Sequence, residues 1–533
     1  MMNNKKMEFI KKNNIIFILI FVGLVWGILN FDILLNQGGD NGRYIMLGRS
    51  ILEGKFMREV NTPAEELHKQ YPPLFPLVLS FIMFIFGREN IFMMKVFSLI
   101  FYLISIFVFF NLLNRYNQKN KFLNIFLVLL FIFARNIVEW SSLVLTESFF
   151  TLLVLLIFFF FSKYRESKKE SDFLIFLIFC TLYTFTRGNG AIVFIATFIY
   201  LILCERNKKL FLLTFIFLLI SQGWAFYIFA KTGHTSSYFQ QVVYKNIYLP
   251  EEGFISLSNF FKRIFLNFIF YFTTIIPRTF SANIDLKWYY VPFFVIPFIL
   301  FIGSIFLSFN KKRYVFEISF ILFNLILLLM WPEYFSTDRF FSPFFSLFLL
   351  LISLVVLNIK FKKEIVINLY YLFISISIIL NVSYLVPEIP RKTYMLSQTD
   401  FNFRNDNRFR PEYGIRTFFD LAIWAKDNTE KDAVIMTVKP ELFYLFSDRK
   451  TVLFPYTYED TTVINYMRKN NVSYVVFENT ENPYRHANLT INVFIKSHQD
   501  YFSYAYTVEE RPLYMLLKVD KNLYSQLNFG EER

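Results

Sequence analysis

The sequence contains little cysteine, histidine and charge for its length. Among 533 residues there are two cysteines and four histidines, and 18% of the residues are charged, whereas a soluble globular protein has about 25%. Cys180 and Cys204 both lie inside apolar runs, so no disulfide framework is expected in the hydrophilic part. No two histidines have the spacing of metal ligands, so the sequence contains no zinc motif.

Apolar residues are abundant instead, at 55% of the chain, with 74 Phe. They recur in long runs nearly free of charge. This excludes a soluble enzyme and a disordered chain and indicates many transmembrane helices. The formal net charge is +14, but most Lys and Arg lie in short loops between the apolar runs, which is the positive-inside pattern of membrane proteins. We therefore expect a lipid bilayer, and no nucleic acid, as a partner.

The cationic loops predict a topology. Six loops carry at least three Lys or Arg each and are expected in the cytoplasm, at residues 5–12, 115–121, 163–169, 206–209, 311–313 and 360–363. Alternating faces between them predicts about eleven to thirteen transmembrane helices, with a cytoplasmic N-terminus and an outer C-terminus. The expected spans are residues 14–35, 91–113, 122–134, 148–161, 173–186, 191–204, 210–230, 288–308, 314–331, 341–357 and 365–386.

Two apolar segments do not fit this alternation as full crossings. Residues 74–86 follow Pro72 and Pro73 and number only 13, whereas a span needs about 20 residues. We expect this segment on the outer membrane surface. Residues 260–276 are expected to lie there too.

The composition changes near residue 387. Residues 1–387 are expected to form a polytopic membrane domain with a first outer loop at 36–90, and residues 388–533 an extracytoplasmic α/β domain. This second part contains no Gly-rich phosphate loop and no nucleophile elbow. Its predicted helices are 416–426, 440–446 and 461–469, and its predicted strands are 432–438, 451–454 and 472–478.

The first outer loop contains the main catalytic candidate. Gly38, Gly39 and Gly42 surround Asp40 where the chain leaves the first apolar run. Glycine lets the backbone approach a ligand closely, and a carboxylate there can act as a general base. The alternative is that Asp40 is an ordinary helix N-cap.

Further polar candidates follow at outer helix ends. Glu147 is expected to begin a helix, and the alternative is that this acid only complements the helix dipole. Three arginines are also candidates, and the alternative for them is that they are ordinary interfacial side chains. On the predicted topology all of them emerge on one outer face. An acid near the bilayer with several arginines at the same height suits a polyprenyl-phosphate substrate, whose phosphate lies at the membrane interface. The arginines are Arg187, Arg278 and Arg339.

Four motifs in this order resemble the GT-C glycosyltransferases that use lipid-carrier sugars. These include the aminoarabinose transferases of lipid A, the protein O-mannosyltransferases and the rhizobial-type core sugar transferases. The resemblance covers residues 1–386. The motifs are Asp40 followed by Tyr44, Gly48, Leu52 and Gly54; Tyr71-Pro72-Pro73-Leu74-Phe75-Pro76; Leu145-Thr146-Glu147; and Arg339-Phe340-Phe341-Ser342-Pro343.

The resemblance implies a sugar moved with inversion from a polyprenyl-phosphate carrier to a hydroxyl of an extracytoplasmic lipid, glycan or protein. It implies an α-helical polytopic GT-C fold in the plasma (inner) membrane. Asp40 and Glu147 are the implied catalytic residues. No obligatory cofactor is expected, although a divalent metal stays open because metal dependence varies in the superfamily. The implied substrate-binding residues are Tyr44, Lys69, Tyr71, Arg187, Arg278 and Arg339.

The sequence departs from the family pattern at two places. Asn41 follows Asp40 where many relatives have an acidic pair, and Tyr71 stands where aminoarabinose transferases have a lysine before the proline pair. Two other functions stay open, a polysaccharide polymerase or ligase and a lipid-linked glycan transporter. A transporter would carry charges deep in several spans and show repeats. Here Lys95 and Glu317 are the exceptions in nearly uncharged spans.

Overall fold

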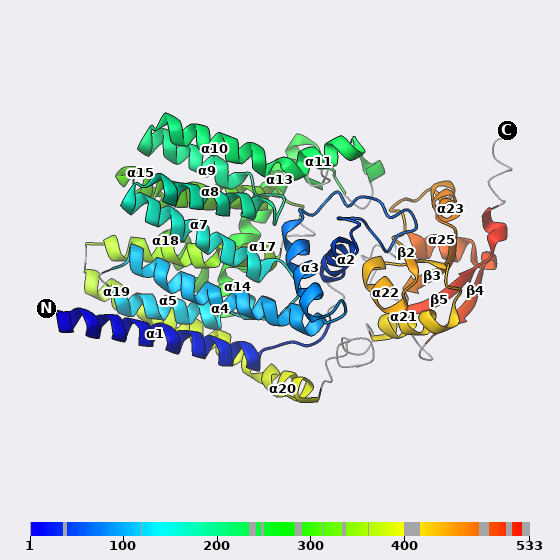
Figure 1. Ribbon diagram of the computed structural model, residues 1–533, viewed down its shortest axis with the longest axis horizontal. Coiled ribbons are helices and arrows are strands. Elements are labelled where there is room, and N and C mark those ends of the chain that lie inside the picture. Colours follow the sequence, from blue (N-terminus) through cyan, green and yellow to red (C-terminus); the bar gives the residue numbers. More distant parts are fainter. Residues whose placement is uncertain are drawn as a thin grey trace.

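The computed structural model describes most of the chain as a helical bundle followed by a small sheet domain (Figure 1). The described residues are 2–35, 40–118, 120–233, 241–246, 250–282, 290–312, 314–332, 337–360, 362–398, 416–478, 490–507 and 514–524.

Long apolar helices form the bundle, with α4 and α7 packed together. Asparagine side chains cap several of them, because an Asn oxygen accepts from the free N–H groups of the first turn. Asn90 caps α4, Asn120 caps α5 and Asn207 caps α10. The helices are α1 (Met2–Leu29), α4 (Ile91–Tyr116), α5 (Lys121–Phe133), α6 (Arg135–Val138), α7 (Glu147–Ser167), α8 (Glu170–Thr184), α9 (Ile192–Tyr200), α10 (Lys208–Ser221), α11 (Gly223–Thr232), α13 (Leu257–Phe270), α14 (Ile276–Ser281), α15 (Val291–Lys311), α16 (Val315–Met330), α17 (Asp338–Phe341), α18 (Phe345–Asn358), α19 (Lys363–Leu385) and α20 (Ile389–Gln398).

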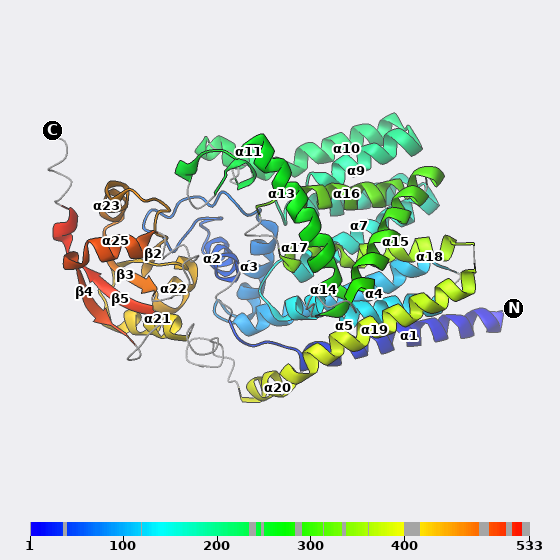
Figure 2. The ribbon, with the colours of Figure 1, turned by 180° about the vertical axis from the view of Figure 1, so that it is seen from behind.

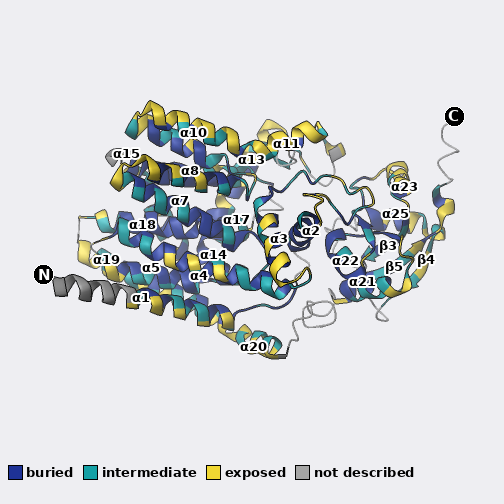
Figure 3. Cartoon of the chain, in the orientation of Figure 1, coloured by how far each residue is buried: buried dark blue, intermediate teal, exposed yellow. Residues whose placement is uncertain are grey.

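The bundle has the features of a multi-pass membrane protein. In the described residues, seven helical runs are long and apolar enough to cross a membrane, or eight if the bent pair Lys121–Phe133 and Arg135–Ser142 is one span. Three of the other predicted spans correspond to shorter apolar helices, Asn14–Leu29, Ile192–Glu205 and Val315–Met330. Large apolar side chains are exposed on the outer helices, as expected for lipid contact (Figure 3).

The extent of one predicted segment is corrected. Residues 260–276 belong to a longer continuous helical run, Leu257–Ser281, which is long and apolar enough to cross a membrane. Their predicted place on the outer membrane surface stays a prediction. Arg263 and Asn267 are buried, and they donate to backbone carbonyls of Val242 and Leu329 at 2.8 and 2.9 Å. Their polar groups are therefore satisfied within the protein rather than in water.

Two short helices lie between the bundle and the sheet domain. They are α2 (Asn41–Leu52) and α3 (Leu74–Phe86), which pack against each other. Both views show them crossing the end of the bundle (Figures 1 and 2). The predicted extent of 74–86 is confirmed.

Within the described residues, the C-terminal part contains a five-stranded sheet of order β2-β1-β3-β5-β4. In this sheet β1 is parallel to both β2 and β3, and β5 is antiparallel to both of its neighbours, β3 and β4. All six predicted elements are present, and β4, β5 and α25 were not predicted. The domain boundary at 387/388 stays a prediction. The elements are α21 (Arg416–Asn428), β1 (Val434–Met436), α22 (Pro440–Ser447), β2 (Lys450–Val452), α23 (Asp460–Lys469), β3 (Val472–Glu478), α25 (Ile491–Ser497), β4 (Phe502–Tyr506) and β5 (Tyr514–Val519).

A buried lysine joins the stems of the two loops that lead to the candidate acids. The Lys95 ammonium donates to the carbonyls of Asp32 and Leu34, both at 2.8 Å, and to that of Ser142 at 3.1 Å. The first two residues precede Asp40 and the third precedes Glu147. An ammonium group has three N–H donors, and three acceptors satisfy them here.

We expect Lys95→Met to destabilise the fold, because three buried carbonyls lose their charged donor. The cost should be about 2–5 kcal/mol, with Lys95→Arg recovering part of it. Thermal unfolding of the detergent-solubilised protein measures this. Lys209→Met is the matched control, because Lys209 is exposed and paired with Glu170. Equal stability of the Lys95→Met and Lys209→Met proteins would contradict the role of Lys95.

Candidate functional site

Asp40 stands at the N-cap position of α2, but its side chain does not cap the helix. Instead, its Oδ2 accepts a hydrogen bond of 3.0 Å from Nη1 of Arg339, which lies on α17. The Asp40 side chain is 33% exposed, and that of Arg339 is 12% exposed. The carboxylate is therefore engaged in an ion pair and still reachable from solvent.

Arg339 also binds a second carboxylate, that of Glu147. Its Nε donates to Oε1 of Glu147 in the first turn of α7, and Nη2 of Arg187 donates to the same oxygen at 3.1 Å. Glu147 is buried, with a side chain only 1% exposed. Its Oε2 has no hydrogen-bond partner within the described parts of the chain. One buried carboxylate therefore fixes two arginines at one place.

The turn that bears Arg187 needs glycine. Arg187 lies between α8 and α9, in a turn in which the backbone N–H of Gly190 donates to the Arg187 carbonyl at 3.1 Å. A Cβ at Gly190 would come within 2.2 Å of the Thr184 Cα, so no larger residue fits. The Arg187 guanidinium stacks between the rings of Phe150 and Phe340, at 5.1 and 5.4 Å. These contacts orient the charge.

Aromatic side chains support Asp40 from the other side. Tyr71 hydrogen bonds the Asp40 carboxylate, and its ring stacks on Tyr44 at a centroid distance of 4.8 Å. Buried His68 accepts from the Tyr71 backbone N–H through Nε2 at 2.9 Å, so its proton is on Nδ1, which faces Glu59 at 2.9 Å. His68 and Glu59 thus fix the position of Tyr71.

The charges around Asp40 determine its acidity. Burial raises the pKa of the carboxyl, but the charges of Arg339 and Arg43 and the hydrogen bonds from Tyr71 and Arg339 lower the pKa from 3.8 to about 2. Asp40 is consequently ionised at neutral pH.

The C-terminal domain forms the wall opposite Asp40. Arg43 pairs with Glu441 on α22, where its Nε donates at 2.6 Å. A Cβ at Gly42 would lie 2.7 Å from the Leu442 side chain, so glycine lets α2 and α22 approach closely. Between them lies a cavity of about 130 Å³ that Asp40 and Arg43 line together with Lys439 and neighbouring residues of the sheet domain.

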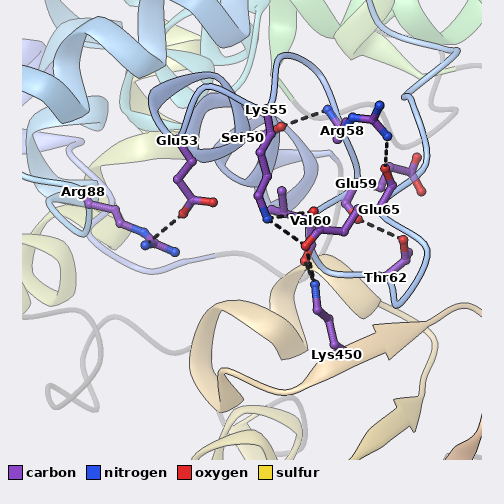
Figure 4. A network of polar contacts seen from close by, with 10 residues as sticks. All are labelled: Ser50, Glu53, Lys55, Arg58, Glu59, Val60, Thr62, Glu65, Arg88 and Lys450. Carbon is purple, nitrogen blue, oxygen red and sulfur yellow. Dashed lines mark hydrogen bonds and ion pairs between the residues drawn. The ribbon is translucent and has the colours of Figure 1, made fainter. Parts of the chain in front are cut away.

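A second polar network holds the two parts together at the surface (Figure 4). Glu65 of the first loop accepts from Lys55 and Lys450, each at 2.8 Å, and Lys450 also donates to the Val60 carbonyl. Next to it, the backbone N–H of Thr451 donates to the Asn61 carbonyl at 2.7 Å. The edge strand β2 is therefore attached to the first loop by a backbone hydrogen bond, and the loop covers part of its free edge.

The structure brings together five of the eight predicted site residues directly, Asp40, Glu147, Arg187, Arg339 and Tyr71, and stacks Tyr44 on Tyr71. Lys69 and Arg278 are not joined to this network by any hydrogen bond or ion pair in the described regions, and Arg278 is exposed on α14. Their predicted role in substrate binding stays a prediction.

The sequence did not single out Arg43, His68 or Glu441. Arg43 lies one helical turn from Asp40, and this spacing was the available signal. His68 and Glu441 offered no local signal, because their partners are fixed only by the fold. Across the described residues, no group of three or more His, Cys, Asp or Glu side chains could hold a metal ion.

Comparisons with known proteins agree with this architecture. Residues 70–230 match the family model described as dolichyl-phosphate-mannose-protein mannosyltransferase. ArnT from Cupriavidus metallidurans in the apo state has a TM-score of 0.59 at 11% identity, with 96% of this chain and 99% of that chain covered. The same protein bound to undecaprenyl phosphate has a TM-score of 0.57 at 10% identity, with coverage of 94% and 97%.

A third solved structure is also similar. The archaeal oligosaccharyltransferase AglB from Archaeoglobus fulgidus, in complex with an inhibitory peptide and a dolichol-phosphate, has a TM-score of 0.54 at 13% identity, with 96% of this chain and 76% of that chain covered. No curated protein sequence matches this chain. At these identities the structural likeness establishes a shared fold.

Buried His68 predicts a pH dependence of stability. Burial lowers its pKa below 6.5, although Glu59 opposes this shift. The unfolded chain then binds a proton more readily than the folded chain, so the stabilisation is full above about pH 6.5 and is lost as the pH falls. Thermal unfolding between pH 8 and 5.5 should show this loss, and His68→Asn should reduce its slope. An unchanged slope in that variant would contradict the assignment.

Proposed function

Because the chain is a multi-pass membrane protein with the GT-C glycosyltransferase fold, we propose that it moves a sugar from a polyprenyl-phosphate carrier to a hydroxyl of an extracytoplasmic acceptor. The similar structures support this donor class, since ArnT was solved with undecaprenyl phosphate and AglB with a dolichol-phosphate.

The observation that supports the proposal most is that Asp40, Glu147, Arg187 and Arg339 come together in one network of ion pairs. The two arginines lie at helix ends, where the phosphate of a membrane-embedded carrier would lie. A guanidinium matches the geometry of phosphate oxygens. Asp40 lies between these arginines and the cavity of about 130 Å³, through which the acceptor would arrive.

The transfer needs one base and one stabilised leaving group. The acceptor hydroxyl attacks the anomeric carbon and gives its proton to Asp40. The bond between that carbon and the phosphate oxygen breaks, and its electron pair leaves with the polyprenyl phosphate, so the configuration inverts. The leaving group is already acidic and needs no proton. Arg339 and Arg187 stabilise its charge.

Glu147 acts as a positioning residue in this proposal. It is buried and does not line the cavity beside Asp40, so it would hold the two arginines rather than contact the acceptor. Tyr71 and Tyr44 would position Asp40. The proposal requires no contact from Lys69 or Arg278.

We place the site and the C-terminal domain on the extracytoplasmic side of the plasma (inner) membrane. The support is the distribution of charge. Helix α7, for example, begins at Glu147, which binds Arg339, and ends at Ser167 within the cationic loop 163–169. On this placement, Asp40 and Arg339 face the compartment in which the acceptor is found.

Replacing the base should abolish transfer without unfolding the protein. Asp40→Asn should lower turnover by about 10²–10⁴-fold, as expected for loss of a general base. The measurement is sugar transfer in membranes with a panel of polyprenyl-phosphate sugars. Asp432→Asn is the matched control, since Asp432 is exposed and precedes β1, whereas the cavity-lining Val438 and Lys439 follow that strand. Full activity of Asp40→Asn would remove the proposed base.

Arg187 should affect the donor rather than the acceptor. Arg187→Gln should raise the donor KM by about 10–100-fold, which corresponds to the ~1.5–3 kcal/mol of a hydrogen bond to a charged group. The acceptor KM should change little, and initial rates at varied donor and acceptor concentrations separate the two. A matching rise in both constants would count against a phosphate contact.

A further inference from the structure

The two arginines of the site have carboxylate partners in this structure. Nη1 of Arg339 binds Asp40 at 3.0 Å, its Nε binds Glu147, and Arg187 binds the same Glu147 oxygen at 3.1 Å. Two positive and two negative charges therefore compensate one another. A donor phosphate that binds Nη1 of Arg339 therefore competes with the Asp40 carboxylate for that arginine.

The two carboxylates differ in how easily they can be replaced. Glu147 is 1% exposed, so separating it from both arginines would leave an unpaired charge in the interior, which is costly. Asp40 is 33% exposed and lines the cavity beside the C-terminal domain. It can be hydrated there, and Tyr71 still hydrogen bonds to it. The Asp40–Arg339 pair is the weaker of the two.

We propose that the donor phosphate takes Nη1 of Arg339 from Asp40 and thereby releases Asp40 to act as the base. This inference rests on the proposed function, and it gives Arg339 a second catalytic role besides stabilising the leaving group. It also sets an order, in which the donor binds first and the acceptor hydroxyl is activated second.

The acidity of Asp40 fits this role. With a pKa of about 2, the carboxylate paired with Arg339 is a poor base, because a general base works best when its pKa is near the working pH. Separating Arg339 from Asp40 removes a lowering influence and makes the carboxylate more basic. The charged and titratable groups around Asp40 are Arg43 and Tyr44 of α2, Tyr71, Arg339 of α17 with Glu147 and Arg187 behind it, and Lys439, Glu441 and Tyr456 around the cavity.

The test follows the reactivity of the Asp40 carboxyl in the full-length protein in lipid nanodiscs. A water-soluble carbodiimide with an amine labels protonated, accessible carboxyl groups, and mass spectrometry quantifies the labelling rate at Asp40 from pH 4 to 7. In this range the rate is proportional to the small protonated fraction of a carboxyl with a pKa of about 2. The probe is undecaprenyl phosphate, the carrier without a sugar, and exposed Asp432 is the internal reference. We expect the carrier to raise the labelling rate at Asp40, relative to Asp432, by about tenfold or more, because a rise of one unit in the pKa gives about tenfold more protonated carboxyl at these pH values.

Two variants separate Arg339 from the other arginine. Arg339→Gln should show the raised labelling rate already without carrier, whereas Arg187→Gln, which leaves the Asp40–Arg339 pair intact, should keep the wild-type rate. A wild-type labelling rate in carrier-free Arg339→Gln would overturn the proposal. So would a carrier-induced rise of the same size in Arg339→Gln, because the phosphate would then act on Asp40 directly.

The outcome also separates this inference from the proposed function. Thermal stabilisation of the wild type by undecaprenyl phosphate reports carrier binding independently of Asp40. If the carrier binds but leaves Asp40 labelling unchanged, the release of Asp40 is wrong and the donor class stands. If the carrier neither stabilises the protein nor alters labelling, the proposed function fails and the inference fails with it.

Discussion

The ion pairs that join Asp40 to Arg339 and Arg339 to Glu147 connect parts of the chain up to 299 residues apart. They lie where the first loop, the start of α7 and the short helix α17 meet. Burying charge is costly unless the charges are paired, so this set constrains the three segments to one relative position. Arg187 completes the set through a turn in which only glycine fits at position 190. The site is thus held by electrostatics as well as by the apolar core.

Contacts outside the site preserve that geometry. Lys95 joins the loop stems that precede Asp40 and Glu147. On the opposite side, Glu65 and Lys450 attach the sheet domain to the first loop, and Arg43 pairs with Glu441 over the cavity. The C-terminal domain is therefore a wall of the site rather than a separate appendage (Figure 1). Any acceptor that reaches Asp40 through this cavity must contact both parts of the chain.

The sequence predicted the class of fold and much of the site because both left local signals. Apolar runs, cationic loops and short motifs identified the helical bundle, Asp40, Glu147 and Arg339. The full extent of the run Leu257–Ser281 was not predicted, because Arg263 and Asn267 look polar in the sequence but are buried and bonded to carbonyls. The sheet strands β4 and β5 were missed, since their pairing with β3 is long-range. The partners of His68 and Arg43 could likewise be found only in three dimensions.

The central claim is that the arginines held by Glu147 receive the carrier phosphate beside Asp40. A cryo-electron microscopy structure of the full chain in nanodiscs with undecaprenyl phosphate tests it most directly. The account predicts phosphate oxygens within hydrogen-bond distance of both Arg339 and Arg187, with Glu147 still bound to Arg187 and Asp40 turned toward the cavity. A phosphate bound elsewhere, with the Asp40–Arg339 pair intact, would contradict it.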